Sequence, residues 1–240
     1  MKTALITGAN GGIGVALAKK FLSMDYFVVG GYNSNSENIK KLESEFNGRF
    51  FGVRADLKSE KNIKKLYSFV EKNFGHADVL ISNAGIDLYK LLTDTTLKEW
   101  EEVFSVNTNA GFLLCRECLP KMIERKSGKI VFISSIWGLV GGSMETAYSA
   151  SKAAIIGLTK ALAKEVAPSG ITVNCVCPGV IDTPMNDCFS KEEKKDIINS
   201  TPIGRMGTAE EIAELCAFLC GDNAGFITGQ TITADGGFTL

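Results

Sequence analysis

Two side chains four residues apart, Tyr148 and Lys152, carry the most specific chemical signal in the sequence. On a helix this spacing places both on one face, one turn apart. A phenol has an ordinary pKa of about 10, and a neighbouring ammonium favours its phenolate form. We therefore predict that Tyr148 exchanges a proton with a carbonyl or alcohol oxygen, and that Lys152 lowers the pKa of Tyr148.

A second signal is a cluster of glycines near the start, in the stretch Thr7-Gly8-Ala9-Asn10-Gly11-Gly12-Ile13-Gly14. Glycines let the backbone approach a phosphate, and the amino end of the following helix offers free N–H groups to it. The GxGxxG and P-loop patterns are both absent as written. The cluster nevertheless lies in the first strand-to-helix turn, and that position predicts a dinucleotide site.

The glycine turn and the Tyr-Lys pair are positioned by the secondary-structure elements around them. Along the chain, short apolar runs typical of strands alternate with segments whose apolar residues recur at helical spacing. Expected strands cover residues 2–7, 26–31, 49–54, 77–82, 129–134, 171–177 and 228–234. Expected helices lie around residues 13–21, 36–46, 59–74, 97–125, 147–167 and 209–220. This alternation predicts a single-domain Rossmann-type α/β fold over residues 1–240, a doubly wound parallel sheet of about seven strands with helices on both faces. Residues 178–206 interrupt the alternation and are expected to form a loop over the substrate.

The composition argues against several classes of protein. The 26 Lys and Arg residues are balanced by 27 Asp and Glu residues, so no basic excess favours nucleic acid. No apolar run is long enough to span a bilayer and no signal peptide is apparent, so we expect no membrane partner and a cytoplasmic location. The seven cysteines are an odd number, which indicates free thiols, and Cys115 and Cys118 are expected to pack in a core helix. With His76 as the lone histidine, no metal site is expected.

Taken together, the motifs resemble those of the short-chain dehydrogenase/reductase family over nearly the whole chain. In order, they are Thr7-Gly8-x-x-x-Gly12-x-Gly14, Asn83-Ala84-Gly85, Asn107, Ser135, Tyr148-x-x-x-Lys152 and Pro178-Gly179. The resemblance implies an NAD(P)-dependent oxidoreductase that converts a carbonyl to a secondary alcohol by hydride transfer.

The resemblance also implies residue roles. Ser135 would hold the substrate oxygen, Tyr148 would donate the proton, and Lys152 would bind the nicotinamide ribose. Asn107 would hold a water that links Lys152 to solvent, and Asp56 would contact the adenine, although either residue alone would be interpreted as a cap or turn residue. The implied cofactor contacts are Gly8, Asn10, Gly12, Ile13, Gly14, Asn33, Ser34, Asp56, Leu57, Asn83, Ala84, Gly85, Tyr148, Lys152, Pro178, Gly179, Ile181 and Thr183.

Cofactor preference is predicted from residues 30–35, Gly-Gly-Tyr-Asn-Ser-Asn. An acid at the end of the second strand accepts the ribose hydroxyls of NAD, and this segment has none. It also lacks an Arg for the additional phosphate of NADP, and Gly11 stands where many NADP-using relatives carry Arg or Lys. Because Asn10, Asn33 and Ser34 can supply neutral hydrogen bonds, we expect NADP(H) in preference to NAD(H).

Within the family, the general similarity is to bacterial 3-oxoacyl-[acyl-carrier-protein] reductases, at residues 170–174 and 226–230. Arg125, Lys126 and Lys129 could meet an acidic carrier protein, whereas Ser169 stands where carrier-docking relatives often have Arg. A narrower similarity, at residues 133–138, 168–171 and 179–186, is to the reductases of 5-aminopentanone on elongation factor P. Both imply a carbonyl substrate tethered to a protein.

Two further alternatives remain, a reductase of a small-molecule ketone or sugar and a non-catalytic dinucleotide-binding regulator. The regulator is disfavoured because Asn107, Ser135, Tyr148 and Lys152 are all present. The resemblance also implies a homotetramer, because relatives commonly assemble through the helix that carries the Tyr-Lys pair, the helix before it, and the last strand together with the helix that begins at Ala209.

Overall fold

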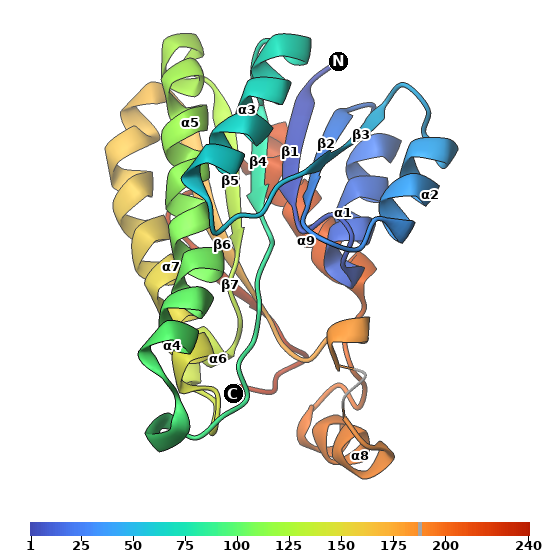
Figure 1. Cartoon of the computed structure of the whole chain (residues 1–240), viewed down its shortest axis with the longest axis vertical. Helices are drawn as coiled ribbons and strands as arrows, with labels where there is room; N and C mark the ends of the chain where they lie inside the picture. The colour runs from blue at the N-terminus through green and yellow to red at the C-terminus, as the bar shows by residue number, and fades with distance from the viewer. Residues whose placement is uncertain (187–188) are drawn as a thin grey trace.

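A parallel sheet of seven strands forms the centre of the protein (Figure 1). The structure is a computed structural model and describes residues 1–186 and 189–240. The strands are β1 (Thr3–Thr7), β2 (Phe27–Tyr32), β3 (Phe50–Arg54), β4 (Val79–Ser82), β5 (Gly128–Ile133), β6 (Ile171–Pro178) and β7 (Thr231–Ala234). Their order is β3-β2-β1-β4-β5-β6-β7, with all neighbours parallel. The order reverses between β1 and β4, and ligands of such sheets bind in the crevice at that reversal.

Helices cover both faces of the sheet, as Figure 1 shows. The α-helices are α1 (Gly12–Ser23), α2 (Glu37–Glu45), α3 (Glu60–Phe74), α4 (Leu97–Phe104), α5 (Ala110–Arg125), α6 (Trp137–Val140), α7 (Thr146–Val166), α8 (Lys191–Ser200) and α9 (Ala209–Cys220). The short helical turns are η1 (Leu92–Asp94), η2 (Ser105–Asn109), η3 (Ala167–Ser169), η4 (Pro184–Asn186) and η5 (Asp222–Ala224). The predicted doubly wound fold is thereby confirmed.

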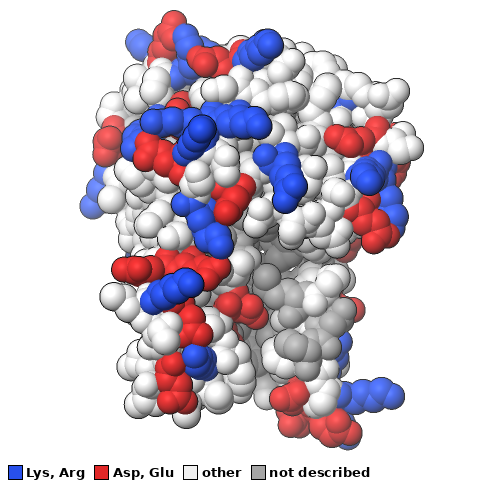
Figure 2. Space-filling model, viewed as in Figure 1, with Lys and Arg blue, Asp and Glu red and all other residues white. Residues whose placement is uncertain are grey.

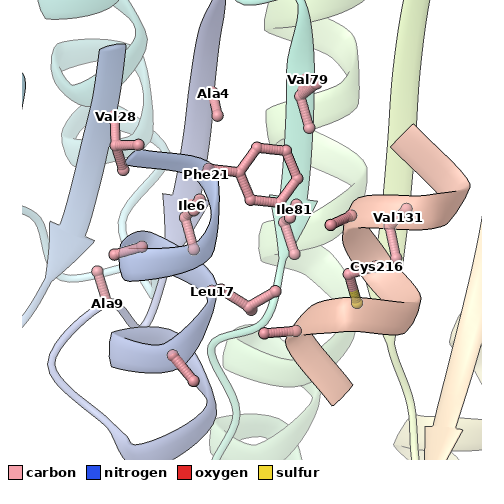
Figure 3. Close-up of a cluster of buried hydrophobic side chains, with 14 of the residues drawn as sticks. Ala4, Ile6, Ala9, Leu17, Phe21, Val28, Val79, Ile81, Val131 and Cys216 are labelled. Atoms are coloured by element: carbon pink, nitrogen blue, oxygen red, sulfur yellow. The ribbon is translucent and has the colours of Figure 1, made fainter. Parts of the chain in front are cut away.

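The protein has two hydrophobic cores, one on each face of the sheet, and they explain why the strands are apolar at nearly every position. Ile6 of β1 faces the core beneath α1 and α9, together with Phe21 and Cys216 (Figure 3). The neighbouring Leu5 faces the opposite core, beneath α3, α5 and α7. Side chains alternate between the faces of a strand, so a strand covered on both sides must be apolar at nearly every position.

The segment predicted as one helix over residues 97–125 differs in the structure. It consists of α4 and α5 joined by the π-helical turn η2, Ser105–Asn109. A π turn is a local widening that apolar periodicity does not reveal, and such turns occur frequently at functional sites. In this protein it contains Asn107, one of the predicted site residues.

The predicted loop at residues 178–206 contains the helix α8. A capping box at Ser190 and Glu193 starts this helix, and none of its residues is buried. The charged stretch at residues 191–195 is therefore largely a solvated helix face. Residues 187 and 188 of this segment, including one of the seven predicted thiols, lie outside the described residues.

The cysteines in the described part of the chain are all free thiols buried in the protein interior. Cys115 and Cys118 lie in the core on α5, as the helix pattern predicts, and burial raises the pKa of both thiols.

Over residues 1–186 and 189–240, the structure shows no group of three or more His, Cys, Asp or Glu side chains that could hold a metal ion. No helix in the described part of the chain has the length and apolarity that crossing a membrane requires. On the face seen in Figure 2, cationic and anionic side chains are interspersed.

Candidate active site

The first strand-to-helix turn is tied to the end of β4. Thr7 Oγ1 accepts hydrogen bonds from the backbone N–H groups of Asn83 and Ala84, both at 3.1 Å. Asn83 Nδ2 donates to the Thr7 carbonyl at 3.0 Å. Two motifs far apart in the sequence therefore meet where the strand order reverses, the place where a doubly wound sheet binds a dinucleotide.

The glycines of this turn are required by its shape. Gly8 has a φ of +66°, and a Cβ on Gly14 would lie 1.9 Å from the Gly8 carbonyl oxygen. Helix α1 begins at Gly12, and within the described chain no side chain caps its amino end. The turn thus leaves helix N–H groups available to an anion, an arrangement that fits the pyrophosphate of a nicotinamide dinucleotide.

The segment after β6 lies against the same turn. A Cβ on Gly12 would come within 2.6 Å of the Thr183 methyl carbon, so these two predicted contacts are neighbours. Ile181 is buried, and its carbonyl accepts a hydrogen bond from Asn186 Nδ2 at 2.7 Å. Gly179 donates its N–H to the Ala234 carbonyl at 3.0 Å, which fixes the turn after Pro178 to the end of β7.

The Tyr-Lys pair is anchored to the end of β5. Ser134 Oγ donates to the Lys152 carbonyl at 2.8 Å, which ties α7 to the residue that follows β5. The next residue, Ser135, accepts a hydrogen bond on Oγ from the Trp137 N–H at 3.2 Å. The Ser135 hydroxyl also hydrogen-bonds the Tyr148 side chain. The Lys152 ammonium lies 5.5 Å from the centre of the Tyr148 ring, so the structure brings Ser135, Tyr148 and Lys152 together.

Lys152 is an unusually buried lysine, with a relative exposure of 3%. Its Nζ donates to the Ile133 carbonyl at 2.9 Å. Burial lowers the pKa of Lys152 from an ordinary 10.5 to about 8, because the charged form loses its hydration. A lysine with such a pKa is a functional-site candidate.

The pKa of Tyr148 corrects one expectation. Burial raises this pKa well above its ordinary value, the charges of Glu145 and Asp87 raise it further, and the hydrogen bond with Ser135 lowers it. The phenol of the chain alone is therefore less acidic than a free phenol, not more acidic. Removal from water, and not the charge of Lys152, therefore sets the pKa of Tyr148.

Asn107 is held in the π turn η2 by its side-chain amide. Its Nδ2 donates to the Ile86 carbonyl and to Ser151 Oγ, both at 2.9 Å, and its Oδ1 accepts from the Ile86 N–H at 2.8 Å. A Cβ on Gly85 would lie 3.2 Å from Lys152 Nζ and 3.3 Å from Asn107 Oδ1. Gly85 therefore keeps a space between Asn107 and the lysine that a larger residue would fill.

The residues predicted to meet the adenosine lie along the ends of β2 and β3 and form no single cluster. Asn33 and Ser34 are exposed. Asp56 Oδ1 accepts from the Lys58 N–H at 3.0 Å, so its carboxylate caps a local turn, and Leu57 is buried. The Asn10 carbonyl accepts from Asn38 Nδ2 at 3.0 Å, which ties the glycine turn to α2.

Two acids near Tyr148 are not predicted by the sequence motifs. Lys90 donates its N–H to the Met144 carbonyl at 2.7 Å, and this bridge holds the segment after Gly85 against the start of α7. Glu145 is half-buried there, and burial and the charge of Asp87 raise its pKa. Neither carboxylate has an ion-pair partner among residues 1–186 and 189–240. The closeness of Asp87 to Glu145 depends on the bridge at Lys90, which no local sequence pattern predicts.

The basic residues expected to meet a carrier protein lie elsewhere. Arg125 ends α5 and pairs with Asp78, which precedes β4, and Lys129 lies at the beginning of β5. Ser135 follows the opposite end of β5, about 20 Å away at the usual rise of a strand. An acidic protein bound at these basic residues would be far from the Tyr-Lys pair of the same chain.

The fold and the site define a nicotinamide-dinucleotide-dependent oxidoreductase of the Rossmann type. A family model described as enoyl-(acyl carrier protein) reductase matches residues 8–239. The chain is 37% identical over 239 residues to the 3-oxoacyl-[acyl-carrier-protein] reductase FabG of Buchnera aphidicola, covering 100% of this chain and 98% of the relative. It is 39% identical over 242 residues to the uncharacterized oxidoreductase YmfI of Bacillus subtilis, covering 99% and 98%. It is also 38% identical over 239 residues to nodulation protein G of Rhizobium meliloti, covering 100% and 97%.

The chain therefore belongs to the short-chain dehydrogenase/reductase family, as its motifs predict. It is an oxidoreductase that acts on a ketone or alcohol group.

Proposed function

We propose that this protein reduces the ketone of a 3-oxoacyl thioester on an acyl carrier protein, with NADPH as the reductant. The observation that carries the proposal is the grouping of Ser135, Tyr148 and Lys152 at the carboxyl end of β5, in the sheet that also places the glycine turn at its carboxyl edge. Relatives named 3-oxoacyl-[acyl-carrier-protein] reductase support the substrate class.

The residues that would hold the cofactor are distributed along this edge. The open amino end of α1 at Gly12 would bind the pyrophosphate, Lys152 the nicotinamide ribose, and Thr183 the carboxamide. Bound there, the cofactor supplies the hydride that the carbonyl carbon accepts.

The remaining chemistry belongs to the side chains. The Ser135 hydroxyl, oriented by the Trp137 N–H, donates a hydrogen bond to the carbonyl oxygen and stabilises the negative charge that develops on it. Tyr148 retains its proton at neutral pH because burial raises its pKa. Since an alkoxide is far more basic than a phenolate, Tyr148 donates that proton to the oxygen. The protonated phenol is the form that reduction requires.

Lys152 and Asn107 complete the proposed site. Lys152 donates one N–H hydrogen bond to the Ile133 carbonyl, and its other N–H groups would bind the ribose and a water. That water would occupy the space beside Gly85 and return a proton to Tyr148 from solvent. Asn107 would keep this space open because its amide is fixed to Ile86 and Ser151.

Asp87 and Glu145 favour a second candidate function, reduction of an aminopentanone on elongation factor P. Both acids contribute negative potential at Tyr148 and have no ion-pair partner in the described part of the chain. A ketone that carries an amine a few carbons from the carbonyl would present a cation to them. A neutral acyl chain would gain no such attraction.

The experiment that tests the proposal compares two substrates with the purified protein and NADPH. We expect rapid loss of NADPH with an acetoacetyl thioester, and slower loss when NADH replaces NADPH. Aminopentanone-modified elongation factor P serves as the second substrate. In the variant Glu145→Gln, the rate with the thioester should change by less than about fivefold, because loss of one partly solvated charge beside Tyr148 costs under about 1 kcal/mol.

The outcomes separate the candidates. A fast reaction with the modified elongation factor, slowed by Glu145→Gln, together with negligible turnover of the thioester, would replace the first function by the second. Tight cofactor binding without turnover of either substrate would reject both tethered substrates and leave the small-molecule reductase and the non-catalytic regulator.

The homotetramer implied by the family is also part of the proposal. Phe112 on α5 and Phe226 before β7 are exposed aromatic side chains, which such an assembly would cover.

A further inference from the structure

Arg54 lies beside the end of β2, although it belongs to the neighbouring strand. It is the last residue of β3, and the register of the sheet pairs it with Tyr32, the last residue of β2. Its Nε donates to the carbonyl of Asn33 at 2.9 Å. The guanidinium therefore lies beside residues 30–35, the segment that contains no arginine of its own.

The charge of Arg54 is unpaired, which sets it apart from the other arginines. The chain has five arginines, all within the described residues. Four of them contact a carboxylate, in the pairs Arg49–Asp25, Arg116–Glu60, Arg125–Asp78 and Arg205–Glu211. For Arg54, no carboxylate of residues 1–186 and 189–240 lies within ion-pair distance.

The nearby acids are engaged by other groups. Glu43 Oε1 accepts the Gly52 N–H at 3.0 Å, and the Asp56 carboxylate accepts the Lys58 N–H. Glu37, at the start of α2, pairs with Lys41 at 2.8 Å. The positive charge of Arg54 is thus uncompensated in the chain alone.

The guanidinium is also oriented. Its Nε is fixed by the Asn33 carbonyl, and its terminal Nη1 and Nη2 groups have no acceptor among the described residues. These two nitrogens form the fork that binds the oxygens of a phosphate in pairs. An arginine whose Nε is already fixed loses little freedom when this fork binds an anion.

The neighbourhood of the fork suits an anion at the adenosine ribose. Asn33, Ser34 and Asn35 follow β2 and carry no charge, so no side chain in this stretch repels a phosphate. The Ala9 N–H donates to the Gly31 carbonyl at 3.1 Å, which places the end of β2 directly beside the glycine turn. A dinucleotide that extends from that turn would bring its adenosine ribose to the end of β2.

We propose that Arg54 is the residue that selects NADP(H), by binding the 2′-phosphate of the adenosine ribose through its Nη1 and Nη2 groups while the Asn33 carbonyl holds its Nε. This inference rests on the proposed NADPH preference and names the side chain responsible for it. Arg54 thereby supplies from β3 the cation that Gly11 and residues 30–35 lack.

The test measures dissociation constants by calorimetry for NADPH, NADH and 2′,5′-ADP, which carries the 2′-phosphate without the nicotinamide. In Arg54→Ala, binding of NADPH and 2′,5′-ADP should weaken about 30-fold, the loss expected for charged hydrogen bonds to a phosphate. Binding of NADH should change by less than about twofold, because it lacks the phosphate. In Arg54→Lys, the dissociation constants for NADPH and 2′,5′-ADP should lie between those of the wild type and of Arg54→Ala, since lysine keeps the charge but lacks the two-nitrogen fork.

Arg49→Ala is the matched control, because Arg49 directly precedes β3 at its other end and pairs with Asp25. It removes the same charge and should leave all three dissociation constants unchanged. Arg54→Gln, with the fold checked by circular dichroism, replaces Arg54→Ala if the alanine variant is unstable.

Three results would overturn the inference. Equal weakening of NADPH and NADH by Arg54→Ala would mean that Arg54 only supports the end of β2. A preference for NADPH that survives in the variant would reject Arg54 while leaving the proposed function intact. Wild-type protein that binds NADH as tightly as NADPH would reject the proposed cofactor preference itself, and with it the role of Arg54.

Discussion

The variant Tyr148→Phe should lose about a thousandfold in kcat for ketone reduction, within the range that a positioned general acid contributes. Phenylalanine keeps the ring and removes only the hydroxyl, which hydrogen-bonds Ser135 and carries the proton to be donated. The dissociation constant for NADPH should rise by less than about tenfold, since at most one neutral hydrogen bond is lost. Steady-state kinetics and calorimetry measure the two effects separately.

Tyr67→Phe provides the matched control. Tyr67 lies in α3, and its hydroxyl is buried without a hydrogen-bond partner in the described structure. Removing that hydroxyl should leave kcat unchanged and stabilise the fold slightly, because an unsatisfied buried polar group is destabilising. If Tyr148→Phe retained half of the wild-type kcat, Tyr148 would not be the proton donor.

The variant Lys152→Met should abolish ketone reduction and make the protein more stable. At neutral pH the buried ammonium destabilises the fold by about 3 kcal/mol, from the fall of its pKa from 10.5 to about 8 at 1.36 kcal/mol per unit. Methionine has a similar volume, and the lost bond to the Ile133 carbonyl returns about 1 kcal/mol. The free energy of unfolding in urea should therefore rise by about 2 kcal/mol.

The advantage of Lys152→Met should depend on pH with a definite sign. Because the folded-state pKa of Lys152 is depressed, the folded protein loses this proton at a lower pH than the unfolded chain does. Between pH 8 and 10.5 the unfolded state binds more protons, so the wild type gains stability as the pH rises through this range. The difference between variant and wild type should then shrink.

The exposed Lys160 on the same helix supplies the control for this prediction. Lys160→Met should change the unfolding free energy by less than about 0.5 kcal/mol at every pH. A Lys152→Met variant less stable than the wild type at pH 7 would show that the buried ammonium stabilises the fold, and would contradict the destabilisation expected from its lowered pKa.

Periodicity and spacing were sufficient to predict the sheet, its helical layers and the approximate position of most elements. Both are local properties of the sequence. A strand that is buried on both faces, such as β1 with Leu5 and Ile6, is apolar at nearly every position, so its composition indicates its burial. The π turn at Asn107 was not predicted, because one additional residue in a helical turn leaves the surrounding apolar pattern nearly unchanged.

The features of the site that the sequence did not predict depend on contacts between distant segments. Arg54 reaches the end of β2 only through the register of β2 and β3. Glu145 comes near Asp87 only because Lys90 bridges to the start of α7. The pKa of Tyr148 also depends on how deeply its side chain is buried, and the four-residue spacing to Lys152 does not predict that burial.

The central claim is that this chain delivers a hydride from a bound nicotinamide to a substrate carbonyl. The most direct measurement is the mass of the alcohol formed when the wild-type protein reacts with an acetoacetyl thioester and NADPH that carries deuterium at the reactive carbon. We predict one deuterium on the new carbinol carbon in wild-type product, and no product with Tyr148→Phe in the same time. An unlabelled alcohol, or NADPH consumed without any alcohol, would contradict the claim.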